Sequence, residues 1–570
     1  MQSRTLCVCT ALALFIAASW HPDDRVLPAV FTFLALILWD KRGLTIAAAV
    51  AMLTLLYHSR PAAEILGVFA YTFFFCAIAG LRARRAALVG FGFGAGAALL
   101  NLRWLVAEFD SRWAGLILVI IAVYAGIFAA AVGGLIRSPL VRKAGLSGVA
   151  LTVLALPALD YVRTALPRFG TANLYSGDLP GANIDLAQAA QWIGASGLGA
   201  LMAFSSYSAA FWLVNERRAT WSHRSTARSV SRRRLCLALA LILGIVVAGR
   251  IERSRVSEIQ ARPLNIAILQ TVPSPSNRDS VEKPYAAALG DCLRSGQPYD
   301  LIFLPEGAIS IGEWNETGET SGEQLMSLSE LRDKFAPMTN TFWVSGAMIR
   351  EPAGLGLGFR NTAISFAPQF QILGQVDKQF GAPLVEVNPF QGIAVLETIA
   401  ERATHLSRRM ASQKNTAVLP FGSHWQAVVA ICSEHQIPDI WSRRGVSSLN
   451  SIDLQLVLSD ITWFDRSAEE RDQSRLARRL LAAKYHRPLL YVASSGSEFW
   501  DQTGRLLNTL PAQARYGIWR IAIPHRSATV LAGWAPPNEA WPLVAFAGLA
   551  LYRWCRLRFK VRSPRFKVRS

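Results

Sequence analysis

Charged residues are scarce in this chain: they make up 17% of its 570 residues, whereas hydrophobic residues make up 52%. Acidic residues are the scarcer kind, with 39 Asp and Glu against 59 Lys and Arg, which gives a formal net charge of +20. This composition argues against a wholly soluble protein and favours a membrane protein. The basic residues fall in short clusters between long apolar segments, so they indicate membrane topology, and we expect no nucleic-acid partner.

Cysteine is also infrequent, with seven residues in the chain. All of them except Cys292 and Cys432 lie in or beside apolar segments, and no two have the CxxC spacing of a metal site. The adjacent Glu434 and His435 lack the HExxH spacing of a zinc site. We therefore expect neither a disulfide framework nor a bound metal.

Long apolar stretches fill the first 250 residues. Several are near the roughly 20 residues that cross a bilayer as a helix, and we expect about nine spans, give or take about two. The stretches lie at 4–20, 27–39, 44–57, 65–81, 86–106, 113–136, 145–165, 189–214 and 234–250. The first could instead be a cleaved signal peptide. The series Gly90, Gly92, Gly94 and Gly96 favours close helix packing over a nucleotide-binding loop.

Basic residues mark every second loop between these stretches. They are Lys41 and Arg42; Arg82, Arg84 and Arg85; Arg137, Arg142 and Lys143; and the run of arginines from Arg217 to Arg234. Because basic loops face the cytoplasm, the N-terminus is expected inside and residues 251–538 outside. We predict a multi-span domain at 1–255, an extracytoplasmic domain at 262–525, a C-terminal transmembrane helix at 540–556 and a basic cytoplasmic tail at 557–570.

Residues 262–525 have a different character. Short runs rich in Val, Ile, Leu and Phe, bounded by turn residues, predict buried strands at 264–270, 301–306, 342–349, 361–366, 427–434, 454–460 and 488–495. Between the last two runs, the charged stretch 467–487 has apolar residues at helical spacing. This alternation predicts an α/β layered domain that is large enough to bury a full core.

Three reactive side chains follow apolar runs, and strand ends are where ligand sites form in open α/β sheets. Glu306 follows such a run and a proline, so partial desolvation is expected to raise its pKa and suit it to general-base work. Lys378 could stabilise the oxyanion of an acyl transfer, and Cys432 could be a nucleophile. Taken singly, they also fit a surface glutamate, a surface lysine and a core cysteine. Glu434, two positions after Cys432, would share its strand face, which favours a common site.

The order Glu306, Lys378, Cys432 on successive strands resembles the catalytic triad of the nitrilase, or carbon–nitrogen hydrolase, superfamily. With the membrane spans added, the chain resembles the apolipoprotein N-acyltransferase family. In that family further glutamates follow the lysine by eight positions and the cysteine by two, as Glu386 and Glu434 do here. The likeness also includes the segments 158–201, 456–464 and 487–504 and the Trp541-Pro542 pair.

The resemblance implies a multi-span α-helical membrane domain, a nitrilase-like αββα sandwich and a C-terminal transmembrane helix, in a bacterial inner membrane. It implies that Cys432 takes an acyl chain from a membrane phospholipid as a thioester and passes it to the N-terminal amine of a diacylglyceryl-cysteine lipoprotein. Glu306 would be the base, Lys378 would stabilise the oxyanion, and Glu386 and Glu434 would support the lysine. The expected partners are the bilayer and the two lipid substrates, and no metal or organic cofactor is implied.

Departures from the family pattern leave alternatives open. Residues 379–386 agree only loosely with the family's motif after the lysine, Ser433 stands where the family has an aromatic residue, and Asp465 stands where it has a glycine. The loose motif after Lys378 makes a conjugal-transfer-type membrane relative with a different acceptor an alternative, and a catalytically inactive membrane scaffold is another. A transporter is disfavoured because the apolar stretches contain few charged residues. Transfer to an amine and hydrolysis by water both stay open.

Overall fold

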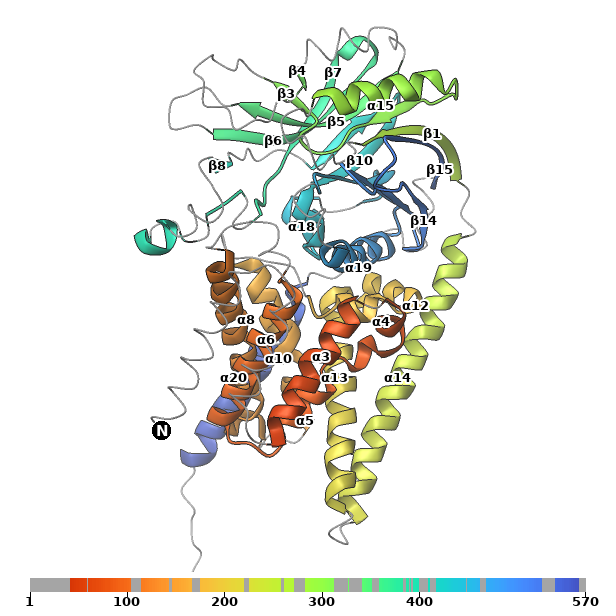
Figure 1. Ribbon diagram of the computed structural model, residues 1–570. Helices are drawn as coiled ribbons and strands as arrows, with labels where there is room; N and C mark the ends of the chain where they lie inside the picture. Colours follow the sequence, from red (N-terminus) through yellow and green to blue (C-terminus); the bar gives the residue numbers. More distant parts are fainter. Residues whose placement is uncertain are drawn as a thin grey trace, which may run out of the picture.

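The chain folds into a helical bundle with an α/β domain seated on one end of it, as the computed structural model in Figure 1 shows. The long helix α14 (Ser225–Ser257) leads from the bundle into the α/β domain, and α20 (Trp541–Arg562) follows that domain. The structure describes residues 41–562 except 59, 104–113, 143–145, 167–174, 220–224, 258–260, 271–281, 312–325, 328–340, 351–357, 383–385, 389, 391–392, 399–408, 411–416, 447–448, 462–467 and 525–538.

Four helices in the described part of the chain are long and apolar enough to cross a membrane, and each matches a predicted span. They are α8 (Ala114–Ile136), α10 (Leu146–Ala165), α13 (Ala190–Ala219) and α14. The predicted stretches at 44–57, 65–81 and 86–106 form α3 (Lys41–His58), α5 (Thr72–Ile78) and α6 (Ala83–Asn101), which do not meet the same standard of length and hydropathy. The predicted stretches at 4–20 and 27–39 lie outside the described residues.

Glycine allows α6 to lie directly against α8. A Cβ atom at Gly90 would stand 2.2 Å from the carbonyl oxygen of Ala129, and one at Gly94 would stand 2.6 Å from that of Ala125. No side chain tolerates such an approach, so the two backbones meet only because both positions lack a Cβ. The predicted packing role of the glycines is confirmed at these two positions.

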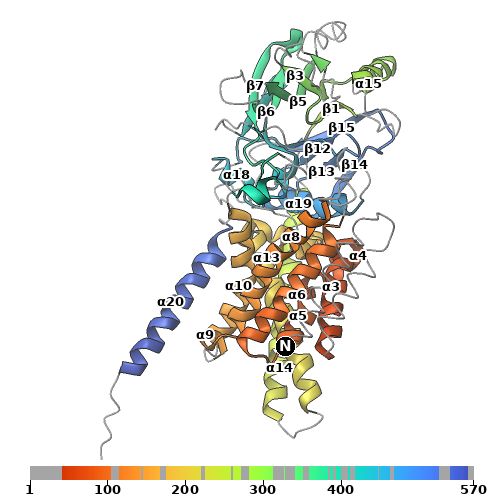
Figure 2. The same cartoon turned by 60° about the vertical axis from the view of Figure 1, so that its left-hand side comes forward.

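The C-terminal helix α20 begins at Trp541 as predicted and contacts α10. Figure 2 shows α20 at the outside of the bundle, running obliquely away from it toward the C-terminal end. Its start is fixed by Glu539, whose carboxylate accepts hydrogen bonds from the backbone N–H groups of Ala195 and Ser196 at 2.9 and 2.6 Å. These two residues follow a break in α13 and leave N–H groups without helical partners, which a carboxylate satisfies. Whether α20 crosses the membrane stays a prediction.

Two sheets form the α/β domain. The first has the order β15-β1-β2-β5-β3-β4, with β6, β7 and β8 joined beyond β5, and the second has the order β14-β13-β12-β11-β10-β9. The strands are β1 (Ala261–Leu269), β2 (Leu301–Phe303), β3 (Ile309–Ile311), β4 (Met326–Ser327), β5 (Phe342–Arg350), β6 (Gly358–Phe366), β7 (Ile372–Asp377), β8 (Arg409–Met410), β9 (Val418–Phe421), β10 (Trp425–Ile431), β11 (Leu454–Ser459), β12 (Leu489–Ala493), β13 (Glu498–Trp500), β14 (Leu506–Thr509) and β15 (Tyr516–Pro524).

The two sheets pack face to face and carry helices on their outer faces. Ile266 and Val344 of the first sheet share one apolar core with Val429 and Leu456 of the second. The helix α15 (Glu282–Arg294) covers the outer face of the first sheet, and α18 (Ile440–Arg443) and α19 (Ala468–Tyr485) cover that of the second. The predicted αββα sandwich is confirmed. Its central strands are the continuous apolar runs of the sequence, because parallel strands between two layers bury both faces.

The helix α19 lies between the second sheet and the bundle (Figure 1). Leu481 packs into the core beneath the second sheet, whereas Leu480 packs against apolar residues of the bundle. Arg479 donates a hydrogen bond to the carbonyl oxygen of Ala182, and Lys484 lies 2.5 Å from the Glu539 carboxylate. One helix therefore belongs to the cores of both parts.

Candidate active site

Glu306 lies in the turn after β2, and its carboxylate is buried. The turn passes so close to β5 that a Cβ atom at Gly346 would stand 2.4 Å from the Glu306 Cα atom. The carboxylate accepts hydrogen bonds from the backbone N–H of Asp460 at 2.7 Å and from the Asn361 side-chain amide at 2.5 Å. Burial raises the pKa of Glu306 above its ordinary value, although the nearby Lys378 opposes this shift. The Glu306 carboxylate therefore binds a proton more strongly than an exposed glutamate does.

Lys378 follows β7, and its ammonium group is buried between two carboxylates. The Nζ atom lies 2.7 Å from Oε2 of Glu386 and 3.4 Å from Oε1 of Glu306. Burial by itself lowers the pKa of Lys378, but the Cys432 thiolate and the two carboxylates together raise it well above its usual range. The ammonium therefore stays charged, and its shorter contact is with Glu386 rather than with Glu306.

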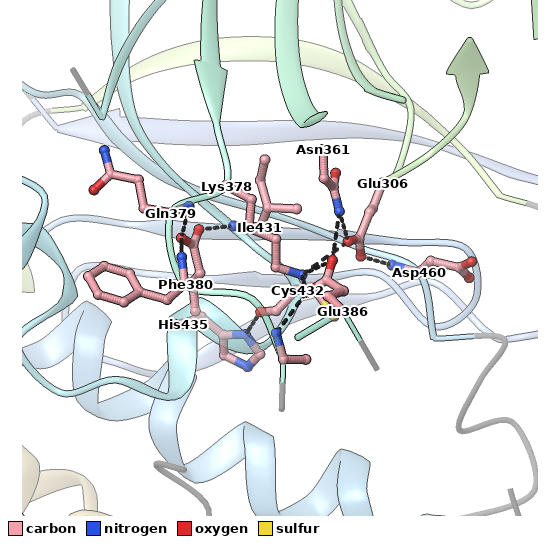
Figure 3. Close-up of polar contacts among 12 residues, drawn as sticks. Glu306, Asn361, Lys378, Gln379, Phe380, Glu386, Ile431, Cys432, His435 and Asp460 are labelled. Atoms are coloured by element: carbon pink, nitrogen blue, oxygen red, sulfur yellow. Dashed lines mark hydrogen bonds and ion pairs between the residues drawn. The ribbon is translucent and has the colours of Figure 1, made fainter. Parts of the chain in front are cut away.

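Cys432 follows β10 and begins the short 3-10 helix η4 (Cys432–Gln436). It has a φ of +54°, a left-handed conformation that is uncommon for a residue with a side chain and that clusters at functional sites. Figure 3 shows Cys432 beside Lys378, with Glu306 and Glu386 around the same ammonium. The structure thus brings together the three residues of the predicted triad, and Glu386 with them.

Glu434 is placed differently from the prediction. We expected it to continue the strand of Cys432 and to share its face, but the strand ends at Ile431 and Glu434 lies in η4. Its buried carboxylate accepts hydrogen bonds from the backbone N–H groups of Gln379 and Phe380 at 2.8 and 3.0 Å. Glu434 therefore joins the loop after Lys378 to the turn that carries Cys432.

The sequence did not single out Asn361 or Arg444. Asn361 donates hydrogen bonds to both Glu306 and Glu386, at 2.5 and 3.2 Å, so it orients the two carboxylates together. Arg444 is buried and forms an ion pair of 2.9 Å with Glu434. A polar residue at the start of the apolar run 361–366 is the signal that could have identified Asn361. Arg444 lies in a turn, and nothing in its sequence neighbours points to a buried partner.

The site holds a buried carboxylate and a buried cation beside a half-buried thiol. This combination can deprotonate a thiol, let it attack a carbonyl carbon and stabilise the oxyanion that forms. Within the described ranges, no group of three or more His, Cys, Asp or Glu side chains is arranged to hold a metal ion. The absence of a cofactor stays a prediction.

Comparison with known proteins gives a match in the membrane part. Residues 50–208 match the family model described as the apolipoprotein N-acyltransferase N-terminal domain. No curated protein matches the chain.

Several solved structures resemble part of the chain. An amidase from Nesterenkonia sp. is 15% identical, with 46% of this chain and 92% of that chain covered and a TM-score of 0.30. A carbon–nitrogen hydrolase from Helicobacter pylori G27 is 13% identical, with 54% and 96% covered and a TM-score of 0.32. Nit3 of Saccharomyces cerevisiae, a member of branch 10 of the nitrilase superfamily, is 13% identical, with 47% and 92% covered and a TM-score of 0.31. The chain is thus similar in its membrane part to apolipoprotein N-acyltransferases and, over 45 to 54% of its length, to carbon–nitrogen hydrolases.

Proposed function

We propose that this protein is a membrane-bound acyltransferase of the carbon–nitrogen hydrolase kind, with Cys432 as its nucleophile. It takes an acyl chain from a phospholipid and passes it to the N-terminal amine of a diacylglyceryl-cysteine lipoprotein. The observation that carries the proposal is the cluster in which Lys378 lies 3.4 Å from Glu306 and beside Cys432. The family match over residues 50–208 supports the choice of lipid substrates.

In the first half-reaction, Glu306 takes the proton of the Cys432 thiol and the thiolate attacks the carbonyl carbon of the acyl ester. Lys378 donates a hydrogen bond to the oxyanion of the tetrahedral intermediate, where preorganised donors act most strongly. The ester C–O bond then breaks, Glu306 returns the proton to the departing lysophospholipid, and the acyl chain stays on Cys432 as a thioester.

In the second half-reaction, the acceptor amine attacks the thioester carbonyl carbon. Glu306 accepts the proton that the amine loses, the C–S bond breaks, and the proton passes to the Cys432 sulfur. The amide product leaves and the free thiol is restored. Glu386 and Asn361 hold Lys378 and Glu306 in place throughout, because Glu386 accepts a hydrogen bond from Lys378 and Asn361 donates hydrogen bonds to both Glu306 and Glu386.

The position of the nucleophile turn supports lipid substrates. The helix η4, which begins with Cys432, packs against α19, the helix that lies on the bundle. An acyl chain that stays near a bilayer avoids a cost of about 0.8 kcal/mol for each CH₂ group moved into water. We further propose, from the positive-inside rule, that this side of the membrane is the extracytoplasmic one.

A labelling experiment tests the proposal. The purified full chain is mixed with vesicles whose phospholipid carries an alkyne-labelled acyl chain, and the labelled peptide is identified by mass spectrometry. We expect the label on Cys432. A diacylglyceryl-cysteine peptide with a free amine should then remove the label and become acylated, whereas the same peptide with an acetylated amine should not. Equal loss of label with both peptides would show hydrolysis by water instead of transfer.

The raised pKa of Glu306 predicts the pH dependence of acylation. The base must be ionised to accept the thiol proton, so the acylation rate should fall as the pH drops through the raised pKa of Glu306. Glu306→Gln should lower the rate at neutral pH by about 10²- to 10⁴-fold. Its residual rate should rise with pH as the thiol ionises without help. Rates are measured across pH by the appearance of labelled protein, and a variant with the wild-type profile would remove Glu306 from the mechanism.

A further inference from the structure

His435 makes a hydrogen bond to the main chain of the nucleophile itself. Its Nδ1 atom lies 2.5 Å from the carbonyl oxygen of Cys432, and its Nε2 atom lies 3.4 Å from Nη1 of Arg478 (Figure 3 shows the first of these contacts). A carbonyl oxygen can only accept, so Nδ1 must carry a proton. A guanidinium group can only donate, so Nε2 must present its lone pair. The two contacts together select one neutral tautomer of His435.

Arg478 is fixed in turn by contacts on several sides. Its Nε atom lies 3.0 Å from Oε2 of Glu498, its Nη1 atom donates to Ser474 Oγ at 2.9 Å, and its guanidinium carbon lies 4.0 Å from the centre of the Tyr491 ring. Arg478 and Glu498 are each 1% exposed, and His435 is 3% exposed. A buried guanidinium with this many partners has little freedom to move, so it holds the imidazole in one place.

We propose that His435, held by Arg478, is a positioning residue that fixes the peptide plane between Cys432 and Ser433 and thereby the placement of the nucleophile. The proposal rests on the function proposed above for Cys432. All described peptide bonds are trans, so the Ser433 N–H points opposite to the Cys432 carbonyl group. When His435 holds the carbonyl oxygen, it fixes the direction of that N–H and supports the left-handed conformation at Cys432.

His435 does not act as the base in this arrangement. Both of its ring nitrogens are occupied, one by the Cys432 carbonyl oxygen and one by Arg478. Burial, together with the neighbouring Arg478, lowers the pKa of His435 to about 3, which keeps the ring neutral near pH 7. The base is therefore Glu306, and His435 acts through the main chain.

Three substitutions at His435 distinguish the effect of its hydrogen-bond donor from the effect of its side-chain volume. His435→Phe keeps a ring and removes the donor, His435→Asn offers an amide N–H near the position of Nδ1, and His435→Gln offers one near the position of Nε2. The first-order rate of Cys432 acylation at saturating labelled phospholipid and the half-saturating phospholipid concentration are measured for the full chain in detergent, along with the thermal midpoint. His486→Phe is the matched control, because His486 is also buried and directly follows α19.

We expect His435→Phe and His435→Gln to acylate about 100-fold more slowly, the effect of a small misplacement of a reacting group. His435→Asn should keep most of the rate, and the half-saturating concentration should not change in any variant. Wild-type rates in His435→Phe, or equal losses in His435→Asn and His435→Gln, would overturn the positioning role. If His435→Phe does not fold, the comparison of the Asn and Gln variants decides. A wild-type protein that takes up no label on Cys432 would instead overturn the function on which the proposal rests.

Discussion

Cys432→Ala is expected to abolish acylation of the protein. Without the thiol no thioester can form, and loss of a nucleophile costs a covalent enzyme on the order of 10⁴-fold or more in rate. The substitution removes one sulfur atom from a partly exposed position, so the fold and the thermal midpoint should change little. The measurement is the amount of alkyne label on the protein after incubation with labelled phospholipid, together with transfer to a diacylglyceryl-cysteine peptide.

Cys292→Ala provides the matched control. Cys292 lies on α15 and is fully buried, and burial raises the pKa of its thiol to about 11, so it stays protonated and unreactive near neutral pH. The control should label like the wild type. Label that persists in Cys432→Ala and is lost in Cys292→Ala would show that Cys292 is the acylated residue and would end the proposed mechanism.

Lys378→Met is expected to affect both stability and rate. Removing the ammonium leaves the buried Glu386 and Glu306 carboxylates without their cation, and loss of one partner of a buried ion pair typically costs about 3–5 kcal/mol of stability. The oxyanion also loses a donor, which lowers the rate by about 10²- to 10³-fold. Thermal unfolding in detergent measures the first effect, and the acylation rate measures the second.

A double variant separates the two effects of Lys378. In Lys378→Met/Glu386→Gln the carboxylate that lies 2.7 Å from the ammonium is also neutralised, so much of the lost stability should return. The rate should stay low, because no cation faces the oxyanion. A double variant with both stability and rate restored would mean that Lys378 serves only to neutralise buried charge.

The sequence predicted the elements whose patterns are local. The apolar runs that became β1, β5, β10 and β11 are buried on both faces, so their hydrophobicity alone identifies them. A strand end was expected at Lys378, but no range was predicted for β7, because four of its six residues are exposed or half-buried and the run lacks an apolar pattern. Glu306, Lys378 and Cys432 could be proposed because each lies just after a strand, and their order along the chain carried the resemblance to a known triad.

The rest of the site depends on contacts between residues far apart in the chain. Asn361 and Glu306 form a hydrogen bond although they are 55 residues apart in the chain. His435, in the turn that carries Cys432, contacts Arg478, which is 43 residues away. The hydrophobic periodicity of the sequence carries no information about contacts between such distant residues. The local error at Glu434 has a simple cause: the chain turns at Cys432 with its left-handed conformation, so the strand ends at Ile431, three residues before the predicted end, and the alternation of strand faces ends there too.

The helix α19 contacts both the nucleophile turn and the helical bundle, so the α/β domain cannot be separated from the bundle without consequences. Arg478 supports the nucleophile turn, whereas the next residues, Arg479 and Leu480, contact the bundle at Ala182 and Gly181. A soluble fragment that starts at β1 would expose this apolar and cationic surface to water, so it should aggregate, and the support of its nucleophile should weaken. Detergents that loosen the membrane helices should for the same reason slow acylation without entering the active site.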